Sequence, residues 1–328
     1  MSKVVVVTGA SAGVGRAAAK AFGRRGDRVA LIARGTESLD GAAQEVSETG
    51  GEPLVVPADV ADHEQVERAA GRTEDELGPI EVWVNNAMAT VFAPFEEIDP
   101  QEFARVTEVA YLGVVWGTRA ALSRMRRRNR GAVVQVGSAL AYRGIPLQAP
   151  YCGAKHAIKG FTESLRSELL HDGSRIHLAM VQLPALNTPQ FEIGRAKLNR
   201  QPQPVPPIFQ PEVAADAIVW ASEHRRREVH VGGPTVKTIW GNKLLPALAD
   251  LYLARDGVEA QLTDLPLEGG REGNLFAPVP GDHGTRGRFT DARSRSVQLA
   301  LTKRRRGILG TVALAAVGAV AGVVRRRS

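Results

Sequence analysis

Seven short apolar runs, separated by longer helix-forming stretches, follow one another through the first 235 residues of this 328-residue chain. The runs are rich in β-branched residues and are predicted to be strands: Lys3–Val7, Arg28–Ile32, Leu54–Val56, Glu81–Val84, Ala132–Val136, Ile176–Val181 and Glu228–Val231. The stretches between them have polar faces typical of helices, as in 14–25, 62–77, 101–127 and 152–171. Such alternation predicts an α/β fold with a parallel sheet covered by helices on both faces. Continuous apolar strands agree with that coverage.

The alternation weakens beyond Gly233, and this divides the chain into three parts. We expect a domain over 1–235, a partly irregular C-terminal extension over 236–302 and a tail over 303–328. The boundary is set by a change of pattern, since regular apolar spacing gives way to segments without a clear period.

Several segments near this boundary carry their own signals. Five prolines between 199 and 211 exclude a helix and predict a semi-extended flap, after which Glu212–Glu223 is predicted to be helical. Residues 235–255 predict one helical pair, broken near Pro246. Residues 265–296 are rich in Gly, Pro, Asp and Arg, and this composition predicts an irregular or mobile segment.

The tail contains an uncharged run of 18 residues, 307–324, with basic clusters on both sides. As a helix it would span roughly 27 Å, close to the bilayer core of about 30 Å. Gly318 and Gly322 form a GxxxG pair, which lets helices approach closely. The run therefore favours a terminal transmembrane helix. The alternative is a buried or disordered Ala/Gly-rich tail.

The net charge of +7 is concentrated in the same tail. Seven of the 42 basic residues and no acidic residue lie in 303–328, so the remaining 35 basic residues match the 35 acidic ones. A neutral body gives no basic patch for nucleic acid, and we expect no nucleic-acid partner. The single Cys152 excludes a disulfide within the chain, and no Cys/His spacing predicts a metal site. The N-terminus runs directly into a strand, so a signal peptide is not expected.

A glycine-rich turn, TGASAGVG at 8–15, directly follows the first apolar run and opens a helix. Glycines permit a tight turn and let the backbone approach a pyrophosphate, which the helix N-terminus attracts. The absence of Lys-Ser/Thr after the last glycine excludes a Walker-type phosphate loop. The turn therefore predicts a dinucleotide site with these candidate residues: Gly9, Ser11, Gly13, Val14 and Gly15. The alternative is a glycine turn without a ligand.

Three later features strengthen the dinucleotide prediction. Arg34 follows the second strand, where an adenosine ribose would lie, and a guanidinium there suits a 2′-phosphate. Asp59-Val60 follows the third strand and would face the adenine. Asn86-Ala87 follows the fourth strand, at the edge of the sheet where ligands bind. Alternatively, Arg34 is a solvated surface charge and Asp59 an ordinary helix cap.

Tyr151 and Lys155 are four residues apart and share one helical face. A nearby ammonium favours a phenolate, so we expect Lys155 to lower the pKa of Tyr151 toward the working range. Ser138 ends the fifth strand and could donate to the same substrate oxygen. The three side chains together predict a proton-transfer site, whereas a Tyr-x-x-x-Lys pair alone is more often structural.

These motifs together resemble those of short-chain dehydrogenases/reductases. The matching elements are TGASAGVG at 8–15, NNA at 85–87, Ser138 and YCGAK at 151–155, in the family's order and spacing. The resemblance covers roughly residues 1–235. It implies a Rossmann-type doubly wound sheet of seven parallel strands, NAD(P) binding, and hydride transfer between nicotinamide and a carbonyl or alcohol carbon.

The resemblance also implies roles for single residues. Tyr151 would be the acid–base residue, Lys155 would also hold the nicotinamide ribose, and Ser138 would orient the substrate. Arg34 is similar to the NADP-preferring branch, so NADP is expected rather than NAD.

Two positions depart from the family pattern. Ala110 stands where the family often has an asparagine that helps to hold a proton-relaying water. The family's Pro-Gly turn after the sixth strand is Pro184-Ala185 here, and Thr188 would contact the nicotinamide amide.

The loops expected at the carboxyl edge of the sheet are largely apolar: Met88–Phe95, Leu140–Leu147 and Leu186–Phe191. They favour an apolar or lipid-like carbonyl or alcohol substrate. Our leading hypothesis is an NADPH-dependent reductase in the cytoplasm, attached to the inner face of a membrane by 307–324. The alternative, motivated by Ala110, is a non-catalytic or weakly active NADP-binding sensor or scaffold. The resemblance also implies a homo-oligomer formed through 101–127 and 151–171.

Overall fold

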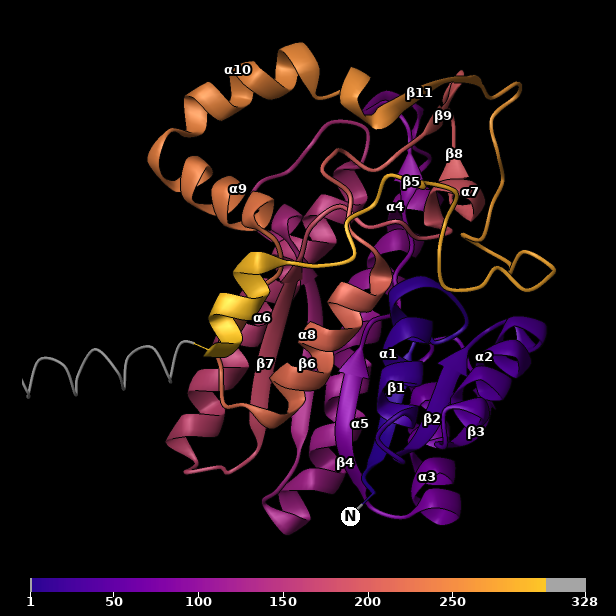
Figure 1. The fold of residues 1–328 in the computed structure, drawn as a ribbon, viewed down its shortest axis with the longest axis vertical. Helices are drawn as coiled ribbons and strands as arrows, with labels where there is room; N and C mark the ends of the chain where they lie inside the picture. Colours follow the sequence, from indigo (N-terminus) through magenta and orange to yellow (C-terminus); the bar gives the residue numbers. More distant parts are fainter. Residues whose placement is uncertain (1, 305–328) are drawn as a thin grey trace, which may run out of the picture.

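A parallel sheet of seven strands forms the centre of the protein, for which the computed structural model describes residues 2–304 (Figure 1). Its order is β10-β7-β6-β4-β1-β2-β3, and every pairing is parallel. The strands are β1 (Val4–Thr8), β2 (Arg28–Ala33), β3 (Glu52–Pro57), β4 (Ile80–Asn85), β6 (Ala132–Ser138), β7 (His177–Leu183) and β10 (Glu228–His230). All seven predicted strands are confirmed, with ends that differ by at most two residues.

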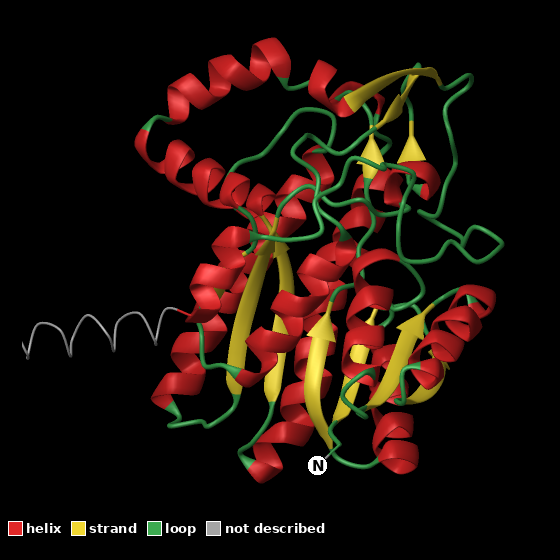
Figure 2. Cartoon of the chain, viewed as in Figure 1, coloured by secondary structure: helices red, strands yellow, loops and turns green. Residues whose placement is uncertain are grey.

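Helices cover both faces of this sheet, so the predicted doubly wound arrangement is confirmed (Figure 2). One apolar cluster joins a sheet face to α1 (Gly13–Gly23), α2 (Thr36–Glu48) and α8 (Pro211–Glu223). A second cluster joins the opposite face to α3 (His63–Leu77), α4 (Pro100–Thr107), α5 (Gly113–Arg128) and α6 (Ala149–His171). Alternate residues of β1 enter the two clusters, and this explains why the strand is apolar throughout.

A π-helical segment, η2 (Glu108–Leu112), interrupts the long helix that was predicted over 101–127. It separates α4 from α5, and Ala110 is fully buried within it. Gly113 follows at the start of α5, where a Cβ would lie only 2.8 Å from Val60 Cγ2. The glycine therefore allows the helix to approach the loop after β3 closely. Single-turn π segments of this kind are frequent at functional sites.

The extension begins with the predicted helical pair, α9 (Gly233–Leu244) and α10 (Pro246–Asp256), which is confirmed with its break at Pro246. The chain then passes η4 (Glu259–Gln261) and β11 (Leu262–Pro266). β11 pairs with β9 (Arg200–Pro202), which lies in the proline-rich loop. That loop is extended as predicted.

Residues 267–296 contain no named helix or strand, so the irregular backbone predicted for 265–296 is confirmed except at its first two residues, which end β11. They return to the body of the protein and run over the carboxyl edge of the sheet, beside α7 (Gln190–Ile193), β5 (Val91–Phe92) and β8 (Arg195–Ala196) (Figure 1). Isolated bridges pair Ala196 with Arg271 and Phe209 with Arg293. The extension and the domain therefore share many contacts within one structure.

No helix among residues 2–304 is long and apolar enough to cross a membrane. The run 307–324, predicted as a transmembrane helix, lies outside the described residues. The predicted homo-oligomer is not tested by a single chain and stays a prediction.

Candidate active site

The glycine turn joins β1 to α1 at the carboxyl edge of the sheet. Gly9 and Gly13 have φ values of 66° and 56°, in the left-handed region that favours glycine. At Gly15 a Cβ would collide with the carbonyl oxygen of Gly9. The backbone therefore forms a cradle that side chains would fill, and the N-terminus of α1 opens into it. Such a cradle fits the pyrophosphate of a dinucleotide.

Asn86 and Ala87 support this turn from the end of β4. The Asn86 amide nitrogen donates to the carbonyl oxygens of Thr8 and Gly9, at 3.0 and 3.2 Å. The backbone nitrogens of Asn86 and Ala87 both donate to the Thr8 hydroxyl, at 3.0 and 3.1 Å. The prediction that Asn86 binds the cofactor stays a prediction. In the structure its side chain holds the glycine turn in place, while Ala87 lines the adjoining cavity.

Four predicted adenosine-side residues, Arg34, Asp59, Val60 and Ala87, line one cavity together with Gly9 and Ser11. The two charged members have partners within the protein. The Asp59 carboxylate pairs with Arg105. The Arg34 guanidinium donates to three successive carbonyl oxygens, those of residues 274–276. The alternative in which Arg34 is a freely solvated charge is therefore wrong for the described structure.

Ser138, Tyr151 and Lys155 lie at the same edge, where β6 ends and α6 begins. The Lys155 ammonium donates to the carbonyl oxygen of Val136 at 2.7 Å and lies 5.4 Å from the centre of the Tyr151 ring. This bond uses one of three ammonium hydrogens, which leaves donors for a ligand hydroxyl. The Ser138 hydroxyl accepts from the Leu140 backbone at 3.1 Å, so its own hydrogen can be donated elsewhere.

The expectation that Lys155 lowers the pKa of Tyr151 is wrong. Burial raises the pKa of Tyr151 above its ordinary value, Cys152 adds to the rise, and Ser138 opposes it. Burial also lowers the pKa of Lys155 to about 8. The ammonium lies against the face of the ring and bonds to Val136, and loss of hydration dominates for both groups. Tyr151 is therefore held in its neutral form at physiological pH.

The two departures from the family pattern have clear positions. Ala110 is fully buried in η2 and its methyl group offers no polar atom. Pro184 lies next to the Gly232 turn, where a Cβ on that glycine would lie 3.5 Å from Pro184 Cγ. Thr188 lies beside the glycine turn, since a Cβ on Gly13 would lie 3.3 Å from the Thr188 side chain. Of these positions, Thr188 is therefore placed beside the cofactor turn.

A buried polar network lies behind the site. The Asn85 side chain accepts from Trp83 Nε1 at 2.8 Å and donates to Thr118 and Gln135 at 3.0 and 2.9 Å. Gln135 also donates to Thr118 at 2.9 Å. These residues fix β4 and β6 against α5. The only sequence signal for this network is the presence of single polar residues, such as Asn85 and Gln135, in otherwise apolar strands. Their spacing along the sequence does not show that their side chains are in contact.

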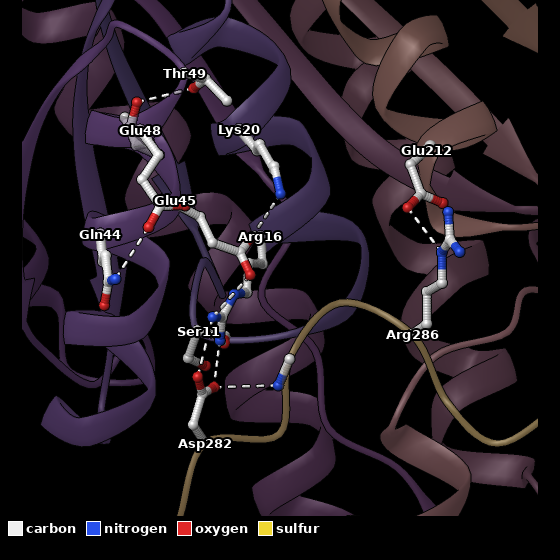
Figure 3. Close-up of polar contacts among 12 residues, drawn as sticks. Ser11, Arg16, Lys20, Gln44, Glu45, Glu48, Thr49, Glu212, Asp282 and Arg286 are labelled. Carbon is white, nitrogen blue, oxygen red and sulfur yellow. Dashed lines mark hydrogen bonds and ion pairs between the residues drawn. The ribbon is translucent and has the colours of Figure 1, made fainter.

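The irregular segment 274–289, which we call the strap, lies across the glycine turn and the loop after β2 (Figure 3). The Asp282 carboxylate pairs with Arg16 of α1, and the Arg286 guanidinium donates to Glu212 of α8 at 2.9 Å. The Gly13 nitrogen donates to the Gly284 carbonyl at 3.1 Å. The composition of the segment predicted its irregular backbone, but no periodic pattern indicated what it would contact.

Two cavities differ in their relation to these residues. A cavity of about 120 Å³ lies between the glycine turn and the strap and includes Arg34 and Asp59. A larger one of about 710 Å³ lies between the start of α9 and residues 293–302. None of the predicted site residues lines the larger cavity. The smaller cavity is therefore the candidate cofactor site, because predicted cofactor-binding residues line it.

The low pKa of Lys155 predicts a pH-dependent contribution to stability. The folded value of about 8 lies below the ordinary 10.5, so the unfolded chain binds one more proton between these values. The free energy of unfolding therefore rises with pH across this window, by at most ~3 kcal/mol. Urea unfolding near pH 7.5 and near pH 10.5 measures it. Wild type should gain stability relative to Lys155→Met, and identical pH dependence in both proteins would contradict the prediction.

Comparison with known proteins agrees with this geometry. Residues 3–198 match the family model described as short chain dehydrogenase. The chain is 31% identical over 304 residues to the uncharacterized oxidoreductase YxnA of Bacillus subtilis, which covers 92% of this chain and 85% of that protein. It is 32% identical to the 3-dehydrosphinganine reductase of Danio rerio, over 57% of each chain.

Two solved structures are also similar. A short-chain dehydrogenase from Streptomyces avermitilis is 30% identical, with a TM-score of 0.64 over 76% of this chain and 95% of that one. An alcohol dehydrogenase from the archaeon Thermococcus sibiricus, complexed with 5-hydroxy-NADP, is 26% identical, with a TM-score of 0.59 over 70% of this chain and 96% of that one. The protein therefore belongs to the short-chain dehydrogenase/reductase family of NAD(P)-dependent oxidoreductases.

Proposed function

We propose that the protein is an NADPH-dependent reductase of apolar carbonyl compounds. The observation that carries this proposal is the grouping of Ser138, Tyr151 and Lys155 at the same sheet edge as the glycine cradle. Strands β6 and β1 are separated only by β4, and parallel strands bring their carboxyl ends to one edge. A proton donor and a nucleotide cradle therefore face one reaction space.

The protonation states favour reduction. The raised pKa of Tyr151 keeps its hydroxyl protonated, so it can donate a proton to a substrate oxygen that gains negative charge. Ser138 can donate a second hydrogen bond to the same oxygen. Lys155 has donors for a ribose hydroxyl and places positive charge beside the ring. When bound, the nicotinamide supplies the hydride.

The preference for NADP rests on Arg34. Its guanidinium lines the cavity beside Ala33, and no carboxylate stands at that position to accept from a free 2′-hydroxyl. A guanidinium can bond a phosphate through two parallel N–H groups. The relative whose structure contains 5-hydroxy-NADP offers a parallel for the cofactor class.

Substitution of Arg34 tests this preference. We expect wild type to bind NADPH at least about tenfold more tightly than NADH, and Arg34→Ala to lose most of that ratio, because a charge-assisted phosphate contact is removed. Fluorescence titration measures both affinities. Arg105→Ala is the control. Like Arg34, Arg105 donates to the Leu275 carbonyl of the strap, but its guanidinium is paired with Asp59. An unchanged ratio in Arg34→Ala would remove the basis for the preference.

The apolar substrate class rests on the loops around the site. The Ala93 nitrogen donates to the Leu147 carbonyl at 3.0 Å, and the rings of Phe92 and Phe191 lie 5.6 Å apart. The predicted pocket-wall loop that contains Phe92 and Ala93 is therefore in contact with both of the other loops. Beside them, α9 is bonded to the Tyr142 carbonyl through Asn242, at 2.8 Å.

Large apolar side chains on α9 and α10 are exposed, and they continue this surface: Trp240, Leu244, Leu248, Leu251 and Tyr252. Exposed apolar groups of this number are unusual on a surface without a partner. The relative named 3-dehydrosphinganine reductase acts, by its name, on a lipid. Together these features support a lipid-like substrate for this chain.

Loss of the Tyr151 hydroxyl tests the reaction. With NADPH and a panel of ketones, Tyr151→Phe should lower the rate of NADPH oxidation by about 10²–10⁴-fold, because the proton donor is absent. Its affinity for NADPH should stay within about threefold of wild type, since the ring is retained. Absorbance at the NADPH band measures the rate, and fluorescence titration measures the affinity.

The panel also separates the substrate classes. Long-chain ketones should be reduced faster than small charged keto acids, and turnover of the small acids alone would overturn the apolar proposal. A non-catalytic sensor, favoured by the apolar Ala110, would bind NADPH but show no Tyr151-dependent oxidation with any carbonyl.

We also propose that the enzyme is attached to the inner face of a membrane by residues 307–324. The support is the length of this uncharged run and its basic flanks, which suit anionic lipid headgroups. The cytosolic supply of NADP(H) supports the location of the catalytic domain.

Truncation after Thr302 tests the anchor. Full-length protein should sediment with anionic vesicles, whereas the truncated protein should stay largely in the supernatant, because it lacks both the apolar run and the basic clusters. Equal sedimentation of the two proteins would eliminate the anchor.

A further inference from the structure

The strap is fixed to five parts of the domain: the loop after β2, α1, α2, α8 and the loop after β7. Its contacts, in chain order, join residues 274–276 to Arg34, Gly281 to Glu37 and Ser38, Asp282 to Arg16, Gly284 to Gly13, Arg286 to Glu212, and Gly287 and Phe289 to Asn187. Almost every second residue from 281 onward makes such a contact. The strap therefore follows the surface of the nucleotide half along its whole length, and Figure 3 shows its contacts at Asp282 and Arg286.

The strap also forms one wall of the cofactor cavity. Its residues Asn274, Pro278, Val279 and His283 face the glycine turn and the loops after β2, β3 and β4. The cavity is partly open to the surface and has a volume of about 120 Å³. Small-molecule sites usually measure about 300–1,000 Å³, and each water occupies about 30 Å³ in the liquid. The cavity therefore has room for a few waters, and a dinucleotide requires the strap to move.

Two groups that would hold a cofactor phosphate are bonded to the strap. The Gly13 N–H, at the start of α1, donates to the Gly284 carbonyl at 3.1 Å. Arg34 donates to the carbonyls of Leu275 and Phe276 at 3.2 and 2.9 Å, and to that of Asn274. Carbonyl oxygens of the strap thus accept from donors that phosphate oxygens would use. The N–H of Gly13 in particular has one hydrogen and cannot fully serve both.

We propose that the strap is a gate of the cofactor site, and that it must leave Gly13 and Arg34 before the dinucleotide can enter. This inference rests on the proposed binding of NADP. It assigns residues 274–289 to the cofactor site, although the match to the family model ends at residue 198. The strap consequently sets the rate of cofactor entry.

The construction of the strap allows this movement. It contains no named helix or strand, so no ladder of backbone hydrogen bonds must break when it opens. Gly281 and Gly284 have φ values of 95° and 65°, so the chain turns sharply at these two positions. One outer ion pair, Arg286 with Glu212, is at the surface, with side chains that are 58% and 38% exposed, and such pairs are individually weak and sensitive to salt. The other joins the 40% exposed Asp282 carboxylate to the buried Arg16, which also pairs with Glu45 and so keeps a partner when the strap leaves.

The first experiment loosens the strap. Asp282→Ala combined with Arg286→Ala removes both outer ion pairs, leaves Gly13 and Arg34 intact and keeps the net charge unchanged. If the open form is the competent one, the apparent association rate of NADPH rises with its population, by about threefold to tenfold. Stopped-flow quenching of tryptophan fluorescence measures this rate without turnover. Arg130→Ala combined with Glu81→Ala, which removes an ion pair at the far end of the sheet, is the matched control.

The second experiment locks the strap. Glu212→Cys and Arg286→Cys place two thiols where the present ion pair joins the strap to α8. A short bismaleimide that contains a reducible disulfide then bridges them, while the native Cys152 is buried. NADPH binding should fall at least about tenfold in the bridged protein and return after reduction. The two single-cysteine variants, treated in the same way, control for modification alone.

The outcomes are distinct. Faster association in the loosened protein, with blocked binding in the bridged one, supports the gate. An association rate equal to that of wild type in the loosened protein overturns it, whatever happens to dissociation, and so does normal NADPH binding by the bridged protein. If wild type binds neither NADPH nor NADH, the proposed function itself fails, and the gate falls with it.

Discussion

The close approach of the glycine turn to the end of β4 is the contact on which the site depends. A Cβ on Gly9 would lie 2.7 Å from the Ala87 Cα, and a Cβ on Gly15 would collide with the Gly9 carbonyl. No side chain separates these backbones, so α1 starts directly above β1 and its N-terminus opens at the sheet edge. Asn86 then bonds the Thr8 and Gly9 carbonyls and prevents the turn from relaxing. The order of the strands brings the Tyr151 helix to the same edge.

Local pattern was sufficient to predict the seven strands and the Tyr151–Lys155 face, because alternation and helical spacing depend on neighbours in the chain. It failed for the protonation state of Tyr151. Sequence spacing shows that Lys155 is near, but not that both groups lose their hydration or that the ammonium bonds to Val136. The pKa of a buried group depends on the tertiary surroundings, and these are not encoded in an i, i+4 interval.

The contacts of the strap with the domain were not predicted from the sequence, for a different physical reason. Its contacts use backbone carbonyls of 274–276, 281 and 284 together with single charged side chains, so it needs no apolar periodicity to dock. Composition alone could indicate only an irregular backbone. The contact between the strap and α1 also affects the ionisation of Asp282, because the Arg16 guanidinium holds the pKa of that carboxyl below its ordinary value. Arg16 itself is almost fully buried, which is unusual for a charged residue unless it is paired.

The extension therefore contacts the candidate site from two sides. Its first half, α9 and α10, adjoins the apolar loops beside Ser138 and presents exposed apolar side chains. Its second half covers the glycine turn. The match to YxnA spans 304 residues, more than the 235-residue domain, so part of the extension is shared with that protein. One addition to the fold therefore contacts both the apolar loops and the glycine turn, and the backbone that follows β11 connects these two sets of contacts.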